Sequence, residues 1–501
     1  MNHPAMVPPG RLLMVDFEGT ALDAGTADFL RTHGIRAVCL FRKNLGTEAQ
    51  IRRLTADLCE VMGAGALIAM DQEGGSVVRA TSLPQAPGAM ALGAVDDEAL
   101  CEHTGAAVAR GLRHMGVNWN FAPVLDVNSN PANPVIAERS FGANPQRVAQ
   151  LARAWLRGSL AEGVAGCLKH FPGHGDTHQD SHHDLPVVNK TEAELEATEL
   201  LPFRALAADA PSVMTAHIVY PQLDPEHPAT LSGAVLTGLL RQRLGYTGVV
   251  ITDALMMQAV HRRWGHSRSA LLALAAGADM PLAQGSRSDQ LAALQAIDRA
   301  QRDGTLDPAA LQAAVQRLDA LAARFPATPR AMTDSQWGAD QLLVRAGWAR
   351  SLCALGGARP PRRDEPLRVV VQGAVASDGV SEAGLPAQAL RPLFKGFADV
   401  QFIEVPSLLA LDEATLRGDG RRRVVLASNQ RSRYVSPQPL RPDLHLVLWN
   451  PYQVLDVAAP AVVTWGYADG ALAALRAWLL GEAGAPGKSP VPLAPATRGT
   501  A

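Results

Sequence analysis

The sequence has no marked excess of charge of either sign. It contains 46 Lys and Arg residues against 48 Asp and Glu, a formal net charge of -2 over 501 residues. Proteins that bind nucleic acid generally need a basic excess, so this balance argues against nucleic acid as a partner. Uncharged apolar runs are also short, and none approaches the ~18 residues of a membrane span. We therefore expect neither a nucleic-acid partner nor a membrane partner.

Cysteine is scarce and scattered. The five residues are Cys39, Cys59, Cys101, Cys167 and Cys353. Their odd number and the lack of Cys-x-x-Cys spacing argue against a disulfide framework and against a thiolate zinc site. The first ten residues lack the basic segment and apolar stretch of a signal peptide. These features predict a cytoplasmic protein.

From residue 12 onward, short β-rich runs alternate with segments of helical period, the pattern of parallel strands buried on both faces. Asn144 and Asp307, each followed by proline, and Thr191, followed three residues later by glutamate, are predicted helix N-caps. Eight such units predict a closed (β/α)8 TIM-type barrel, whose chemistry would lie at the C-terminal strand ends. The predicted strands are Leu12–Phe17, Ala37–Phe41, Ala66–Asp71, Val117–Val127, Gly166–Phe171, Ser212–Ile218, Gly248–Asp253 and Asp279–Ala283.

Turn-forming residues interrupt the alternation around residues 325–340. We therefore predict a TIM-type barrel catalytic domain over residues 1–330, a linker over 331–342 and a C-terminal domain over 343–501. The C-terminal domain is predicted to be a smaller α/β sandwich with helices on both faces of its sheet. Its predicted strands are Leu367–Gln372, Val400–Val405, Arg423–Ser428, Leu444–Trp449 and Ala461–Trp465.

The densest polar segment runs over residues 169–186 and contains histidines at four-residue intervals: His170, His174, His178 and His182. On a helix, this spacing would stack four imidazoles on one face and offer a transition-metal site. A proline and two glycines within the segment disfavour a helix. We therefore predict no metal, and keep a metal-dependent hydrolase as an alternative.

An extended loop would place Asp180 and His182, two residues apart, on the same side. The carboxylate would fix the tautomer of the imidazole, whose other nitrogen could protonate a leaving oxygen and later deprotonate a water. The alternative is a solvated, histidine-rich surface loop without chemistry. A hydrogen-bonded Asp180–His182 dyad therefore remains a hypothesis at this point.

Asp253 ends the continuous apolar run of residues 248–253, where a buried strand would deliver a carboxylate to the mouth of the barrel. A carboxylate there could attack a sugar as a nucleophile. The alternative is an N-cap for the following helix.

A third polar set comprises Asp71 with the residues that follow it, Arg79 and Arg139. Carboxylates and guanidinium groups bind adjacent hydroxyls through charge-assisted hydrogen bonds, so this set suits a polyol ligand. Taken singly, either arginine could instead form a surface ion pair.

Six short motifs follow one another along the first part of the chain. They are Asp-Gln-Glu-Gly-Gly (71–75), Asn-Phe-Ala-Pro-Val-Leu-Asp (120–126), Glu-Arg-Ser-Phe (138–141), Lys-His-Phe-Pro-Gly-His-Gly-Asp-Thr (169–177), Asp-Ser-His (180–182) and Val-Met-Thr-Ala-His (213–217). Together these motifs resemble glycoside hydrolase family 3, specifically its β-N-acetylglucosaminidase branch, the NagZ-type enzymes. Two residues depart from the pattern: Ser76 stands where many relatives have arginine, and Ala254 stands where aspartate is frequent.

The resemblance implies that Asp253 is the nucleophile, His182 the acid/base and Asp180 its partner. It also implies five residues that contact the sugar, namely Asp71, Arg79, Arg139, Lys169 and His170. The implied reaction is retaining hydrolysis of terminal β-linked N-acetylglucosamine, in muropeptides and other peptidoglycan fragments, through a covalent glycosyl-aspartate without cofactor or metal.

Three alternatives stay open. A family 3 β-glucosidase or xylosidase would share the barrel and the nucleophile, and a carbohydrate-binding barrel would have lost turnover. Phosphate could replace water as the acceptor, since a histidine acid/base does not repel an anion. No oligomeric state is predicted.

Overall fold

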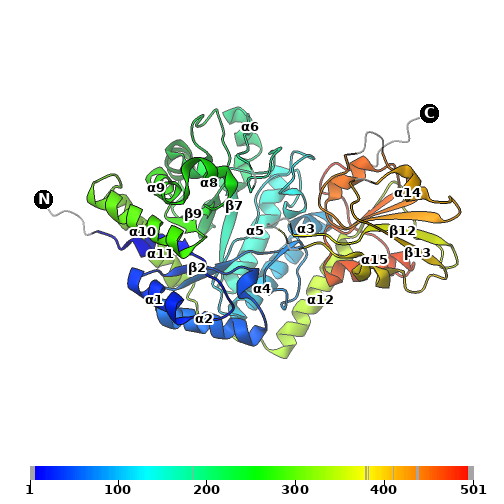
Figure 1. Cartoon of the computed structure of the whole chain (residues 1–501), viewed down its shortest axis with the longest axis horizontal. Coiled ribbons are helices and arrows are strands. Elements are labelled where there is room, and N and C mark those ends of the chain that lie inside the picture. The colour runs from blue at the N-terminus through cyan, green and yellow to red at the C-terminus, as the bar shows by residue number, and fades with distance from the viewer. Residues whose placement is uncertain are drawn as a thin grey trace.

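The computed structural model describes residues 6–182, 184–377, 381, 383–409, 411–435 and 439–494. Eight parallel strands close into a barrel in the order β1-β10-β9-β8-β7-β6-β3-β2 (Figure 1). The predicted (β/α)8 TIM-type barrel is confirmed. Its strands are β1 (Met14–Val15), β2 (Ala37–Cys39), β3 (Leu67–Met70), β6 (Trp119–Asn120), β7 (Ala165–Phe171), β8 (Ser212–Thr215), β9 (Val249–Ala254) and β10 (Met280–Ala283).

Helices surround the barrel, and their starts follow the predicted caps. The side chains of Asn144, Asp307 and Thr191 each accept a backbone N–H in the first helical turn. Among the described residues, no helix is both long and apolar enough to cross a membrane. The barrel helices are α1 (Ala24–His33), α2 (Glu48–Met62), α3 (Ala89–Val95), α4 (Glu98–His114), α5 (Pro145–Ala161), α6 (Glu192–Ala197), α7 (Leu200–Leu206), α8 (Gln258–Trp264), α9 (His266–Ala276), α10 (Arg287–Arg302) and α11 (Pro308–Arg324), with a π-helix over Ala234–Arg243.

The strand predicted over Val117–Val127 is wrong in length, because regular pairing covers only β6, Trp119–Asn120. Pro123 has no N–H to donate to a ladder, and beyond it Val124 adds a single isolated bridge to Lys169. The chain then leaves the barrel wall. This departure carries Asp126 to the mouth of the barrel, where its carboxylate contacts β7.

The interior of the barrel is filled with buried side chains. Trp119 and Phe121 pack edge to face there, with ring centroids 5.4 Å apart, alongside Cys167, Met214 and other buried residues. A short antiparallel hairpin of β4 (Gln72–Gly74) and β5 (Val77–Val78) follows β3. A ligand would therefore lie outside this filled interior, where residues at the C-terminal strand ends line a cavity.

The second part of the chain is a six-stranded sheet in the order β11-β16-β15-β14-β12-β13, parallel except for the β11–β16 pair. One face packs on α13 and α15 and the other on α14, which confirms the predicted α/β sandwich. The edge strand β11 was not predicted. The elements are β11 (Cys353–Leu355), β12 (Leu367–Gln372), α13 (Ala387–Leu390), β13 (Val400–Val405), α14 (Glu413–Arg417), β14 (Arg423–Ser428), β15 (Leu444–Val447), β16 (Ala461–Val463) and α15 (Asp469–Leu479).

Helix α12 (Asp334–Ser351) joins the two parts and lies at their boundary (Figure 1). The segment predicted as a linker, 331–342, is thus helical from Asp334 onward, and Thr333 caps it. Helix α12 packs on α3 and α4 of the barrel and on α15 of the second part. The domain limits 1–330 and 343–501 stay predictions, and their ends at residues 1–5 and 495–501 lie outside the described residues.

Candidate active site

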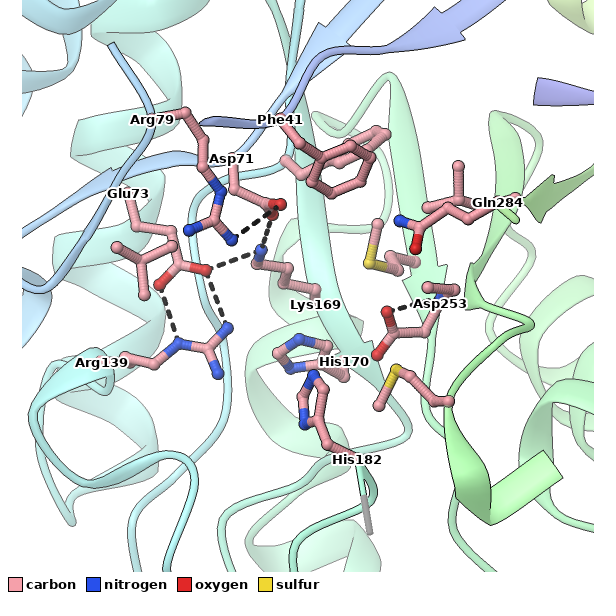
Figure 2. A pocket seen from close by; sticks show the side chains of 16 residues that line it. Phe41, Asp71, Glu73, Arg79, Arg139, Lys169, His170, His182, Asp253 and Gln284 are labelled. Carbon is pink, nitrogen blue, oxygen red and sulfur yellow. Dashed lines mark hydrogen bonds and ion pairs between the residues drawn. The ribbon is translucent and has the colours of Figure 1, made fainter. Parts of the chain in front are cut away.

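A cavity opens at the C-terminal ends of the barrel strands. It brings together seven of the eight predicted site residues, which come from segments spread over more than 180 positions of the sequence. The eighth, Asp180, contacts His182. The predicted residues that line the cavity are Asp71, Arg79, Arg139, Lys169, His170, His182 and Asp253 (Figure 2).

One wall of the cavity is a continuous network of charged side chains (Figure 2). The Lys169 ammonium lies 2.7 Å from Asp71 Oδ1 and 2.7 Å from Glu73 Oε1. Arg139 binds Glu73 through two parallel hydrogen bonds, from Nη2 to Oε1 at 2.8 Å and from Nε to Oε2 at 3.0 Å. Arg79 Nη2 stands 3.6 Å from Asp71 Oδ2. The network fixes the directions of its donors and acceptors.

Mutual attraction keeps the buried members of this network charged. Burial would raise the pKa of Glu73, but the charges of Arg139 and Lys169 lower it well below its usual range. Burial would lower the pKa values of Lys169 and Arg139, but the surrounding carboxylates raise both. The wall therefore presents fixed charges in a site of low dielectric, an arrangement suited to binding hydroxyl groups.

His170 is oriented by a carboxylate that our site prediction omitted. Its Nδ1 lies 2.7 Å from Asp126 Oδ2, and the other oxygen of Asp126 accepts the backbone N–H groups of His170 at 3.1 Å and of His174 at 2.6 Å. Burial would raise the pKa of Asp126, but His170 and His174 lower it. Because the carboxylate accepts the Nδ1 proton, Nε2 is left for the cavity. In the sequence, Asp126 ends the motif of residues 120–126, and this position could have indicated it as a residue of the site.

The predicted pair of Asp180 and His182 is confirmed as a contact. His182 Nδ1 lies 2.7 Å from Asp180 Oδ1, and His182 itself lines the cavity. Burial would raise the pKa of Asp180, but the hydrogen bond and charge of His182 bring it well below its usual range. The two side chains are therefore paired, with His182 at the edge of the cavity, while the catalytic role of the pair stays a prediction.

The four-residue histidine spacing does not correspond to a helix face. Strand β7 ends at Phe171, and the described backbone from there to His182 forms turns and bends. His174 is buried between Thr177 and Ser181, and burial lowers its pKa to about 4. In the described part of the chain, no three His, Cys, Asp or Glu side chains are grouped to hold a metal ion.

Asp253 lies near the end of β9 and points into the cavity from the side opposite Arg139 (Figure 2). It is no N-cap, since the next helix, α8, begins at Gln258 after Met257. Burial would raise the pKa of Asp253, but the imidazoles of His217, His170 and His182 and the Ala254 amide lower it. The carboxylate is thus ionised at neutral pH.

The wall near Asp253 is mostly apolar. Phe41 follows β2 and Gln284 follows β10, and both face the cavity across from Arg139 (Figure 2). Met214, Met257 and Leu282 line it as well. A ligand here meets charged groups on one side and apolar groups on the other, as a sugar ring with polar edges and apolar faces requires. The apolar residues of this wall were not predicted, because apolar positions near strand ends are indistinguishable in sequence from core positions.

Comparisons with known proteins agree with this site. Residues 9–321 match the family described as "Glycosyl hydrolase family 3 N terminal domain". A β-hexosaminidase of Bordetella avium (strain 197N) is 39% identical over 290 residues, which cover 56% of this chain and 82% of the relative. One of Alkalilimnicola ehrlichii is 41% identical over 281 residues, covering 54% and 79%.

Solved structures extend the similarity to the second part of the chain. A glycoside hydrolase family 3 β-N-acetylglucosaminidase from Paenibacillus sp. str. FPU-7 matches with a TM-score of 0.87 and 31% identity, covering 97% of this chain and 98% of that one. NagZ from Neisseria gonorrhoeae, in complex with N-trifluoroacetyl-D-glucosamine, matches with a TM-score of 0.57 and 30% identity, covering 69% and 99%.

The barrel, its charged cavity and these relatives define a glycoside hydrolase. The chain belongs to glycosyl hydrolase family 3. The resemblance drawn from its motifs is confirmed.

Proposed function

We propose that the protein is a retaining exo-β-N-acetylglucosaminidase. The relatives named β-hexosaminidase and β-N-acetylglucosaminidase support this substrate, as does the N-trifluoroacetyl-D-glucosamine in the related gonococcal structure. The observation that carries the proposal is the meeting of an ionised carboxylate, Asp253, and a carboxylate-paired imidazole, His182, in one cavity. A nucleophile and a proton donor are the two groups that a retaining glycosidase needs.

In the first step, Asp253 attacks the anomeric carbon while His182 Nε2 donates a proton to the departing oxygen. The bond from the anomeric carbon to that oxygen breaks, and a glycosyl-aspartate forms. In the second step, the now neutral His182 takes a proton from water while the water oxygen attacks the anomeric carbon. The bond to Asp253 breaks, which frees the carboxylate and releases the sugar with net retention. Asp180 holds Nδ1 throughout and stabilises the imidazolium. These steps use protein groups and water, and they require no cofactor.

The terminal sugar would be held by the charged wall. Asp71, Arg79, Arg139, Lys169 and His170 are proposed to bind its hydroxyl groups. Hydrogen bonds to charged groups contribute about 1.5–3 kcal/mol each, enough for this wall to govern affinity.

The proposed natural substrates are peptidoglycan fragments, including muropeptides, cleaved in the cytoplasm. Each of the five cysteines is unpaired, which suits a reducing compartment. The family branch identified from the sequence motifs supports the choice of an N-acetylglucosaminide over a glucoside or xyloside.

A panel of aryl β-glycosides that share one phenol and differ at the 2-position tests the proposal. We expect the 2-acetamido compound to have the highest kcat/KM and the first-formed sugar to be the β-anomer by NMR. A preference for the 2-hydroxy compound would make the protein a glucosidase. Sugar binding without turnover would make it a carbohydrate-binding barrel. Loss of activity on exhaustive chelation would favour metal-dependent hydrolysis.

A further inference from the structure

A buried glutamate of the barrel is held by the second part of the chain. Glu138 is 1% exposed, and its Oε1 accepts the indole N–H of Trp449 at 2.9 Å. The same oxygen accepts the hydroxyl of Ser76, from the barrel, at 2.7 Å. Its Oε2 has no hydrogen-bond partner among the described residues. The position of this carboxylate therefore depends on donors from both parts of the chain.

Glu138 directly precedes Arg139, the arginine that binds Glu73 in the cavity. Both lie in a short 3-10 turn, Ala137–Arg139, whose first residue has φ 37°. That conformation is unfavourable for alanine and persists only where surrounding contacts hold it. Glu138 extends toward the second part and Arg139 into the cavity. A shift of the turn would therefore move the guanidinium of Arg139.

A second contact reaches the same arginine. The carbonyl of Val135 accepts a hydrogen bond from Arg139 Nη1 at 3.3 Å. Arg431, from the second part, donates to this same carbonyl, and its Nη2 lies 3.7 Å from Glu138 Oε1. The segment that precedes Arg139 is thus tied to the second part at two points, Val135 and Glu138.

We propose that Glu138 is a positioning residue through which the second part of the chain orients Arg139, so that tight sugar binding requires the Trp449–Glu138 contact. The role of Arg139 in binding the sugar rests on the proposed function. Arg139 contacts the bound sugar before and during reaction, and a misplaced guanidinium weakens both states alike. Loss of the contact therefore raises KM and leaves kcat nearly unchanged.

The test compares two tryptophan variants of the full chain. Trp449→Phe keeps an aromatic ring but removes the N–H that binds Glu138. Trp465→Phe is the matched control, because Trp465 is equally buried in the same sheet domain and donates its indole N–H to the Ser351 carbonyl at 2.7 Å. We expect Trp449→Phe to raise KM about threefold to tenfold, the effect of one hydrogen bond, and Trp465→Phe to leave KM unchanged.

An unchanged KM in folded Trp449→Phe would overturn the inference. The inference would also be overturned if Trp465→Phe changed KM and kcat as much as Trp449→Phe does. Should Trp449→Phe fail to fold, Arg431→Met removes the donor that the second part supplies to the Val135 carbonyl and decides in its place. The expected result there is again a raised KM with kcat retained. The comparison uses whichever aryl glycoside the wild type cleaves best, so a preference for another 2-substituent would refute the proposed substrate without affecting this test.

Discussion

A single oxygen of Asp180 contacts His182 at two points: it lies 2.7 Å from the ring Nδ1 and accepts the backbone N–H at 2.9 Å. Because a carboxylate accepts only, the ring carries its proton on Nδ1, and Nε2 is the nitrogen available to a substrate. The double contact also limits how far the ring can turn. The loop can thereby present a proton donor in one orientation.

Asp180→Asn separates the charge of this carboxylate from its geometry. The amide oxygen can still accept both N–H groups, but it cannot stabilise an imidazolium by charge. We expect kcat/KM for an N-acetylglucosamine disaccharide to fall, within the ~10²–10⁴-fold that general acid catalysis contributes. Asp184→Asn is the matched control, because Asp184 is an exposed carboxylate of the same loop. Equal activity of the two variants would contradict the role of Asp180.

Arg139→Lys tests the charged wall. Lysine keeps the positive charge but cannot reproduce the two parallel bonds to Glu73. We expect KM to rise about tenfold to 100-fold, as the loss of a hydrogen bond between charged groups implies, with a smaller change in kcat. Arg147→Lys, which alters a surface arginine paired with Asp96 and Glu98, should leave both constants unchanged. A normal KM in Arg139→Lys would exclude Arg139 from sugar binding.

The pH dependence follows from Asp253. Its pKa lies below the ordinary value of 3.8, so the carboxylate is ionised above that pH and becomes protonated only as the pH falls through the lower value. Asp253 must be ionised to attack, so kcat/KM should hold on acidification to about pH 4 and decline below it. Circular dichroism at each pH identifies losses caused by unfolding. An acidic limb centred above pH 3.8 in folded protein would contradict this environment for Asp253.

Much of the site could be predicted from the sequence, because parallel barrel strands end at one face. Asp71, Lys169 and Asp253 each stand at the end of an apolar run, and barrel geometry alone brings such residues together. The length of β6 could not be predicted, since the apolar run continues after Pro123 while the pairing ceases.

Residues whose partners lie far away in the sequence could not be predicted for a different reason. Asp126 orients His170 across 44 positions, and Glu138 meets Trp449 across 311. A single carboxylate in a loop has no periodicity that reports such a partner. Only the fold shows that these groups are buried and paired.

His182→Ala tests the central claim, which is that His182 donates the proton and Asp253 attacks. Protonation matters most for a poor leaving group, while nucleophilic attack is needed for every substrate. His178→Ala is the matched control, since His178 is an exposed imidazole of the same loop that contacts Asn130. Asp253→Asn should impair the cleavage of good and poor leaving groups alike.

The decisive measurement is the glycosylation rate of folded His182→Ala on two N-acetylglucosaminides, a natural disaccharide and an aryl glycoside of an acidic phenol. We predict a loss of about 10²–10⁴-fold on the disaccharide and a much smaller loss on the aryl glycoside. A burst of phenol should precede a slow steady rate, because water attack also needs His182. Equal proportional losses on the two substrates would contradict the assignment of His182 as the acid/base.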